Sequence, residues 1–201
     1  MAARPEELPP LPYRVVIAED EAIIRMDLRE VLEAEGYEVV GETGRGDEAV
    51  ELVRRLNPDL AVLDIRMPGM DGLSAAREIV GQRRAAVLIL TAFSERNLIE
   101  EARDAGALAY LIKPFQTSEL IAAMEVALAR FREMRALEEE VQGLEETLET
   151  KRLVARAKGI LMDRHGMSEV GAFRFIQQTA MRERAKMRLI AERVINGDIT
   201  P

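Results

Sequence analysis

Cysteine is absent from the 201-residue sequence, and histidine occurs only once. The lack of cysteine excludes a disulfide framework, thiol catalysis and cysteine-based metal sites, and it is typical of a reducing compartment. No stretch approaches the ~20 apolar residues that a membrane helix needs. The opening residues, MAARPEELPPLP, are acidic and proline-rich, unlike a secretion signal. We therefore expect a cytoplasmic protein with no membrane partner.

Charge is distributed unevenly along the chain. Residues 1–150 contain 17 basic and 31 acidic side chains, a net charge of −14, whereas residues 151–201 contain 11 basic and 5 acidic side chains, a net charge of +6. An acidic front half can hold a cation, and a basic tail of this density suits a polyanion. A solvated helical surface would give the same charge pattern, so other features must decide.

From residue 14 onward, short apolar runs alternate with helical patterns. The runs are RVVIA, EVVGE, DLAVLD, AAVLILTA and ALAYLIK. Continuous apolar strands are buried on both faces, and their alternation with helices predicts a parallel sheet covered on each side. The predicted fold class for residues 14–130 is therefore α/β, a doubly wound five-stranded parallel sheet, preceded by a tail at residues 1–13.

A long helix is predicted to begin near Ser118 and to continue beyond the domain, because no glycine or proline breaks the run TSELIAAMEVALARFREMRALEEEVQ. Its later apolar positions recur at steps of four, three and four, which is a coiled-coil heptad: Leu137, Val141, Leu144 and Leu148. We predict a coiled-coil linker at residues 131–150 and a homodimer through residues 134–150. Because two repeats are few, a rigid connector packing against its own domain is an alternative.

Three helical patterns follow the linker, at 151–164, 168–183 and 185–195. Gly166 is expected to stop the first of them, and the Ser168 hydroxyl to cap the second. The last two patterns each have one apolar face, made of Val170, Phe173, Ile176 and Ala180, then Met187, Ile190, Ala191 and Val194. Residues 151–201 are therefore predicted to form a small three-helix bundle.

Acidic side chains follow two of the predicted strands. Glu19 and Asp20 come after VVIA, and Asp64 comes after LAVL. Because residues beyond the carboxyl ends of parallel strands converge on one crevice, these carboxylates should meet. A cluster of acids needs a cation, and oxygen ligands without histidine or thiolate favour Mg²⁺.

Two further strands end in Thr91 and Lys113, which add a hydroxyl and an ammonium group to the same crevice. Together with the acids they form a phosphate pocket in which Lys113 and the metal offset phosphoryl charge while Asp64 attacks. Each residue alone has a structural explanation, such as a helix cap or an exposed strand end. The functional interpretation depends on their shared place at the ends of four strands.

Four motifs in the front half resemble those of bacterial two-component receiver domains, which have a flavodoxin-like fold: AEDE at 18–21, DIRMPGMDG at 64–72, TAFS at 91–94 and AYLIKPF at 109–115. The resemblance implies that Asp64 is the phospho-acceptor and that a separate histidine kinase is the donor, since the lone His165 lies in a turn of the tail. It implies Mg²⁺ ligation by Asp20, Asp64 and the backbone carbonyl of Arg66, with Glu19 acting through water.

The same resemblance assigns Lys113 as the phosphate partner and Thr91 and Tyr110 as a switch pair, and it implies a cis bond before Pro114. A buried strand tyrosine that does not move is the alternative for Tyr110. Glu19 stands where many relatives have aspartate. The bulky Arg66 lies two residues after the acceptor, where it can alter the dephosphorylation rate.

The basic tail could serve as an RNA-binding domain, a DNA-binding domain, or an enzymatic or protein-docking domain. An enzyme is disfavoured because the tail has no cysteine, no glycine-rich phosphate loop and no paired acids on one helical face. DNA binding is the main alternative, because helix, HGMS turn and helix can mimic a helix-turn-helix. However, the second helix opens with Glu169 followed by small and apolar residues, which is typical of a packing helix.

The stretch RAKGILMDRHGMSEVGAFRFIQQTAMRERAKMRLIAERV resembles the ANTAR domain of transcription antitermination regulators. The resemblance implies binding of RNA hairpins that compete with a terminator. Phe173 is interpreted as a core residue, so phosphate and hairpin-shape contacts should dominate over base stacking. We expect the RNA contacts among the basic side chains Arg156, Lys158, Arg184, Lys186 and Arg188.

Overall fold

The computed structural model describes residues 12–92 and 96–201 and divides into two compact units, Met1–Arg135 and Ala136–Pro201. Most of the expected tail at residues 1–13 lies outside the described residues. The expected boundaries at residues 130 and 150 remain predictions.

The first unit is built on a five-stranded parallel sheet with strand order β2-β1-β3-β4-β5. The strands are β1 (Arg14–Ala18), β2 (Glu38–Thr43), β3 (Leu60–Asp64), β4 (Ala86–Thr91) and β5 (Ala109–Ile112). In β1, Val15 and Ile17 face one core while Val16 and Ala18 face the other. This explains the continuous apolar runs, because both faces of the sheet are buried.

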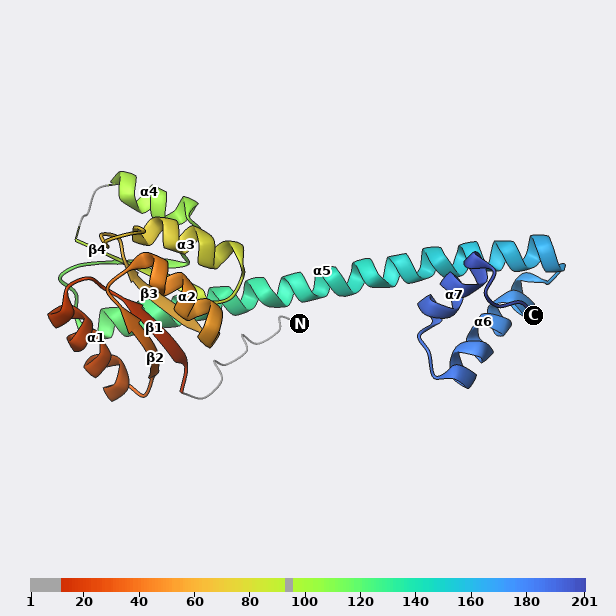
Figure 1. Ribbon diagram of the computed structural model, residues 1–201, viewed down its shortest axis with the longest axis horizontal. Helices are drawn as coiled ribbons and strands as arrows, with labels where there is room; N and C mark the ends of the chain where they lie inside the picture. Colours follow the sequence, from red (N-terminus) through yellow and green to blue (C-terminus); the bar gives the residue numbers. More distant parts are fainter. Residues whose placement is uncertain (1–11, 93–95) are drawn as a thin grey trace, which may run out of the picture. The chain divides into compact units, whose positions relative to one another are not determined.

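Helices cover both faces of the sheet (Figure 1). The helices of this unit are α1 (Ala22–Ala34), α2 (Gly46–Leu56), α3 (Gly72–Gly81), α4 (Arg96–Asp104) and the first part of α5 (Thr117–His165). Residues of α1 and α5 form one core with the sheet, and residues of α2, α3 and α4 form the other. The predicted doubly wound α/β fold is confirmed.

The second unit contains the rest of α5, α6 (Glu169–Glu183) and α7 (Met187–Asn196). Gly166 adopts a φ of +63° after the end of α5, and the Ser168 side chain accepts a hydrogen bond from the backbone N–H of Gly171. The predicted stop and cap are both present. The pattern at residues 151–164 is the last part of α5 rather than a separate helix, because Gly143 is accommodated within a continuous helix.

The core of the second unit corrects one expectation about α6. Val170 is 68% exposed and Phe173 is 42% exposed, so neither belongs to the core. The buried face of α6 consists of Ala172, Ile176, Thr179 and Ala180. The helix is rotated so that small residues face inward, where they pack with Ala157 and Leu161 of α5. The predicted face of α7 is confirmed at Ile190, Ala191 and Val194.

Candidate phosphorylation site and output surface

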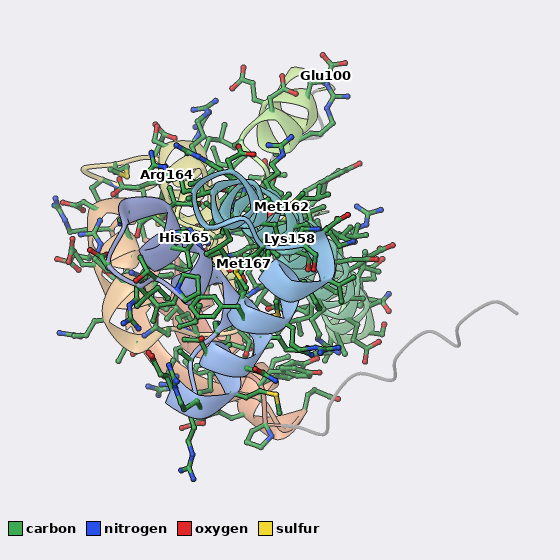
Figure 2. The ribbon with its side chains drawn as sticks, turned by 90° about the vertical axis from the view of Figure 1, so that its right-hand side faces the viewer. Glu100, Lys158, Met162, Arg164, His165 and Met167 are labelled. Atoms are coloured by element: carbon green, nitrogen blue, oxygen red, sulfur yellow. The ribbon has the colours of Figure 1, made fainter. Side chains whose placement is uncertain are left out.

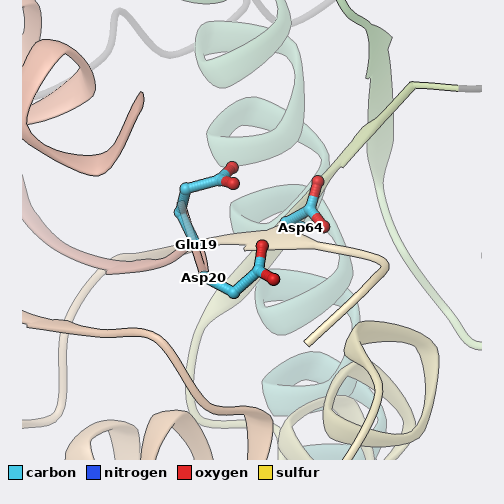
Figure 3. A group of neighbouring side chains, drawn as sticks. All are labelled: Glu19, Asp20 and Asp64. Atoms are coloured by element: carbon cyan, nitrogen blue, oxygen red, sulfur yellow. The ribbon is translucent and has the colours of Figure 1, made fainter. Parts of the chain in front are cut away.

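Three carboxylates converge at the carboxyl edge of the sheet (Figure 3). Glu19 and Asp20 directly follow β1, and Asp64 is the last residue of the neighbouring strand β3. Each offers an oxygen, and these atoms all lie within 4.8 Å of one another. Glu19 and Asp64 are buried whereas Asp20 is exposed, so the cluster has a closed inner side and an open outer side.

Lys113 joins this cluster from the end of β5. Its Nζ lies 2.5 Å from Glu19 Oε2 and 2.6 Å from Asp64 Oδ1. Its backbone N–H donates to the carbonyl of Thr91 at 2.7 Å, which fixes the strand end, and the bond to Pro114 is cis as expected. The structure thus brings together the acids and the ammonium group that the sequence placed at separate strand ends.

Burial and ion pairing shift the pKa values of this cluster in opposite directions. Burial raises the pKa of Glu19, and the hydrogen bond from Lys113 offsets only part of this effect. Burial alone would lower the pKa of Lys113, but hydrogen bonds to Asp64 and Glu19 outweigh it and the pKa is raised. The lysine therefore stays charged, and the crowded acids favour additional positive charge.

The donor set fits a hard divalent cation. All three side chains offer carboxylate oxygens, with no histidine or thiolate among them, which is the ligand chemistry that Mg²⁺ prefers. Glu19, Asp20 and Asp64 are the residues that would hold it. The backbone N–H of Arg66 donates to Asp64 Oδ2 at 2.7 Å, which orients the carboxylate, while the role predicted for the Arg66 carbonyl stays a prediction.

Gly72 is a site residue that the sequence reasoning missed. A Cβ at this position would lie 1.9 Å from the backbone oxygen of Asp64, so only glycine permits this approach. The adjacent Asp71 caps α3 by accepting from the Ser74 N–H at 2.8 Å. The sequence feature that could have identified Gly72 is the Asp71-Gly72 pair at the end of the motif DIRMPGMDG.

The expected switch residues lie on neighbouring strands and differ in exposure. Thr91 is 3% exposed at the end of β4, whereas Tyr110 is 45% exposed on β5. Tyr110 is therefore not the buried strand tyrosine of the alternative interpretation. It lines a cavity of about 590 Å³ together with Arg103 of α4 and Val126 of α5, so movement of its ring would reshape this face.

The predicted RNA-binding side chains fall into two groups. Lys158 is paired with Glu169 at 2.6 Å, and Arg188 with Glu192 at 3.0 Å. The remaining three are exposed and form no ion pair with any residue that the structure describes: Arg156, Arg184 and Lys186. Figure 2 shows Lys158 with Arg164 and His165 around the final turns of α5. Among the five predicted side chains, positive charge is therefore least compensated at Arg156, Arg184 and Lys186.

The four apolar residues that repeat with heptad spacing in the linker, called the seam below, lie outside the hydrophobic cores of both units. Leu137, Val141, Leu144 and Leu148 are 54–59% exposed. Packing of these four side chains against their own domain, the alternative for the linker, is therefore not observed. Within the described ranges, no helix is long and apolar enough to cross a membrane.

Comparison with known proteins assigns a family to each half of the chain. The family model "Response regulator receiver domain" matches residues 15–125, and the model "ANTAR domain" matches residues 142–195. The transcriptional regulatory protein PdtaR of Mycobacterium tuberculosis is 56% identical over 191 residues, covering 95% of this chain and 93% of the relative.

Other relatives match the front half. The chemotaxis protein CheY of Thermotoga maritima is 39% identical over 112 residues, covering 55% of this chain and 93% of the relative. The solved receiver domain of NarL from Mycobacterium tuberculosis superposes with a TM-score of 0.56 at 33% identity, covering 59% of this chain and 98% of that structure. The chain therefore belongs to the response regulators that combine a receiver domain with an ANTAR domain, and it is a homologue of PdtaR.

Proposed function

We propose that this response regulator accepts a phosphoryl group on Asp64 from a histidine kinase, binds RNA hairpins through its ANTAR domain, and thereby promotes transcription antitermination in the cytoplasm. The observation that carries the proposal is the Asp64 carboxylate, buried among acids and hydrogen-bonded by Lys113. Such a chain is a signalling protein rather than an enzyme, at most with slow self-dephosphorylation.

The arrangement at Asp64 fits phosphoryl transfer. An Asp64 oxygen attacks phosphorus, a P–O bond forms, the P–N bond to the donor imidazole breaks, and the leaving imidazole nitrogen takes a proton from water. Lys113 is placed to pair with a phosphoryl oxygen. A Mg²⁺ ion bound by the acids would neutralise charge on the transferring group. Thr91 and Tyr110 would then respond to the new charge.

RNA binding is supported by the ANTAR match and by the positive charge of the tail. The exposed Arg184 and Lys186 lie in one short turn, so they present adjacent charges to a phosphate backbone. Phe173 is 42% exposed, so its ring can also stack on an unpaired base, a contact that the interpretation of Phe173 as a core residue had made minor. No feature of the described residues supports the helix-turn-helix alternative, so DNA binding is not favoured.

An RNA with two hairpins would be bound by two ANTAR domains, one from each chain of a dimer. The exposed seam on α5 is a surface through which two chains would associate. The four seam residues repeat with heptad spacing on α5 and are more than half exposed. A homodimer through residues 134–150 would bury them. Phosphorylation would then act by favouring this dimer or by exposing the basic surface.

Phosphorylation is tested by incubating the chain with a radiolabelled acyl phosphate and Mg²⁺. We expect labelling of the wild type and none of Asp64→Asn. Asp27→Asn, which changes an exposed acid of α1 outside the cluster, should be labelled like the wild type. Equal labelling of Asp64→Asn would refute the assignment of the acceptor.

RNA preference is tested with the full chain, an RNA hairpin and a DNA duplex of equal length. We expect tighter binding of the hairpin, strengthened by the acyl phosphate in the wild type but not in Asp64→Asn. Lys186→Gln should weaken binding more than Arg188→Gln, because only Arg188 is already paired with a carboxylate. Equal or reversed preference for DNA would contradict the RNA assignment.

A further inference from the structure

The backbone of Glu19, next to the candidate metal ligand Asp20, is hydrogen-bonded on both sides. Its N–H donates to the carbonyl oxygen of Thr43 at 3.0 Å, and its own carbonyl oxygen accepts from Arg25 Nη1 at 2.5 Å. That carbonyl belongs to the planar peptide that joins Glu19 to Asp20, and the carboxylates of both residues lie beside that of Asp64 (Figure 3). Arg25 therefore contacts the peptide that orients two of the three acids.

The contact of Arg25 is not explained by the stability of its own helix. Arg25 lies near the start of α1, and its side chain reaches back past the amino-terminal end of that helix to Glu19. A positive charge at this end opposes the helix dipole, so the position is unfavourable for an arginine. Arg25 is partly buried and forms no ion pair with any residue that the structure describes. The contact must therefore have another reason.

The same guanidinium group lies against the loop that follows β2. A Cβ at Gly44 would lie 3.3 Å from Arg25 Nη1, 3.5 Å from Asp20 Cα and 3.7 Å from the backbone oxygen of Glu19. Gly44 thus leaves room for the guanidinium group beside the peptide between Glu19 and Asp20. Three segments that are separate in the sequence meet at this group: the end of β1, the first turns of α1 and the loop after β2.

We propose that Arg25 is a positioning residue for Mg²⁺ binding, because its guanidinium group holds the peptide between Glu19 and Asp20 with both carboxylates directed to the metal site. The inference rests on the proposed phosphorylation of Asp64, which requires the ion. A charged donor forms a stronger hydrogen bond with a carbonyl oxygen than a neutral donor does. Groups that orient the ligands of a metal commonly determine its affinity.

The charge of Arg25 alone predicts the opposite effect on metal binding. A guanidinium group close to Asp20 repels a divalent cation, so removal of this charge without any loss of positioning would raise the affinity for Mg²⁺. Loss of positioning would lower that affinity. The direction of the change in Arg25→Gln therefore distinguishes the two roles.

The positioning role is tested by calorimetric titration of the full chain with Mg²⁺ in the absence of a phosphodonor. We expect Arg25→Gln to weaken Mg²⁺ binding about tenfold, because a charged hydrogen bond to the peptide is lost. Arg25→Lys keeps a charged donor and should recover part of the affinity. Arg29→Gln removes the same charge one turn further along α1, from a surface pair with Glu42, and should bind Mg²⁺ like the wild type.

Labelling by acyl phosphate separates positioning from a general loss of folding. In Arg25→Gln the Mg²⁺ concentration that gives half the maximal rate should rise by the same factor, while the rate at saturating Mg²⁺ should approach that of the wild type. A Mg²⁺ affinity of Arg25→Gln equal to or above that of the wild type would overturn the proposal, as would an Arg25→Lys variant that binds no better than Arg25→Gln. Absence of labelling of the wild type would instead refute the proposed function itself.

Discussion

At the scale of single residues, some contacts of Lys113 could be predicted from the sequence and others could not. The positions of Glu19, Asp64 and Lys113 at strand ends predict that they lie at the same edge of the sheet, because parallel strands have their carboxyl ends on one side. The sequence does not show that one ammonium group bonds both carboxylates, at 2.5 and 2.6 Å. That arrangement depends on side-chain conformations and on strand register, which no local pattern encodes.

The close approach at Gly72 leads to a prediction about stability and activity. Gly72→Ala would force the backbone of Asp64 to move, because the new Cβ would lie 1.9 Å from its oxygen. We expect destabilisation of about 1–3 kcal/mol and slower labelling by acyl phosphate. The matched control is Gly81→Ala, whose Cβ meets nothing within 4 Å. Urea denaturation of both variants measures the difference, and equal stabilities would contradict this explanation.

The raised pKa of Glu19 predicts that metal affinity depends on pH. Burial stabilises the protonated carboxyl, so protons compete with Mg²⁺ at a higher pH than for an ordinary glutamate. The Mg²⁺ affinity measured by calorimetry should fall as the pH is lowered, approaching tenfold per unit below the pKa of Glu19. In Glu19→Gln the pH profile of the affinity should be flatter. A wild-type affinity that does not change with pH would refute this origin.

At the scale of elements, hydrophobic periodicity predicts where helices and strands lie better than how they are rotated. The five strands were predicted because each is buried on both faces. The face of α6 was predicted correctly at Ile176 and Ala180 but wrongly at Val170 and Phe173, because the smaller Ala172 and Thr179 face the core instead. Hydrophobicity alone ranks phenylalanine above alanine, but close packing against α5 favours the smaller side chains.

The exposed seam on α5 gives a prediction about assembly. Leu144→Glu would place a charge in the apolar stripe and should convert dimers to monomers, because burying an unpaired carboxylate is unfavourable. Gln142→Glu adds the same charge on the opposite side of the helix and should leave the dimer intact. Sedimentation velocity distinguishes the two outcomes. A wild type that remains monomeric with and without phosphodonor would contradict the proposed dimer.

At the scale of the whole molecule, the concentration of positive charge in the tail predicts a strong effect of salt on RNA binding. Residues 151–201 carry a net charge of +6, and contacts of their basic side chains with RNA phosphates release counterions. We expect the logarithm of hairpin affinity to fall linearly with the logarithm of salt concentration. Lys186→Gln should make this slope shallower by about one. Filter binding across a salt series measures it, and an unchanged slope would exclude a phosphate contact at Lys186.

The candidate site at Asp64 was predictable because its residues occupy equivalent places, at the carboxyl ends of neighbouring parallel strands.

One helix belongs to two hydrophobic cores. Leu120 and Met124 of α5 are buried in the first unit, and Ala157 and Leu161 of the same helix are buried in the second. Any cut between them leaves a helix end with four unpaired backbone groups. Excised halves would therefore fray at the new terminus, and their separate stabilities would not sum to that of the intact chain.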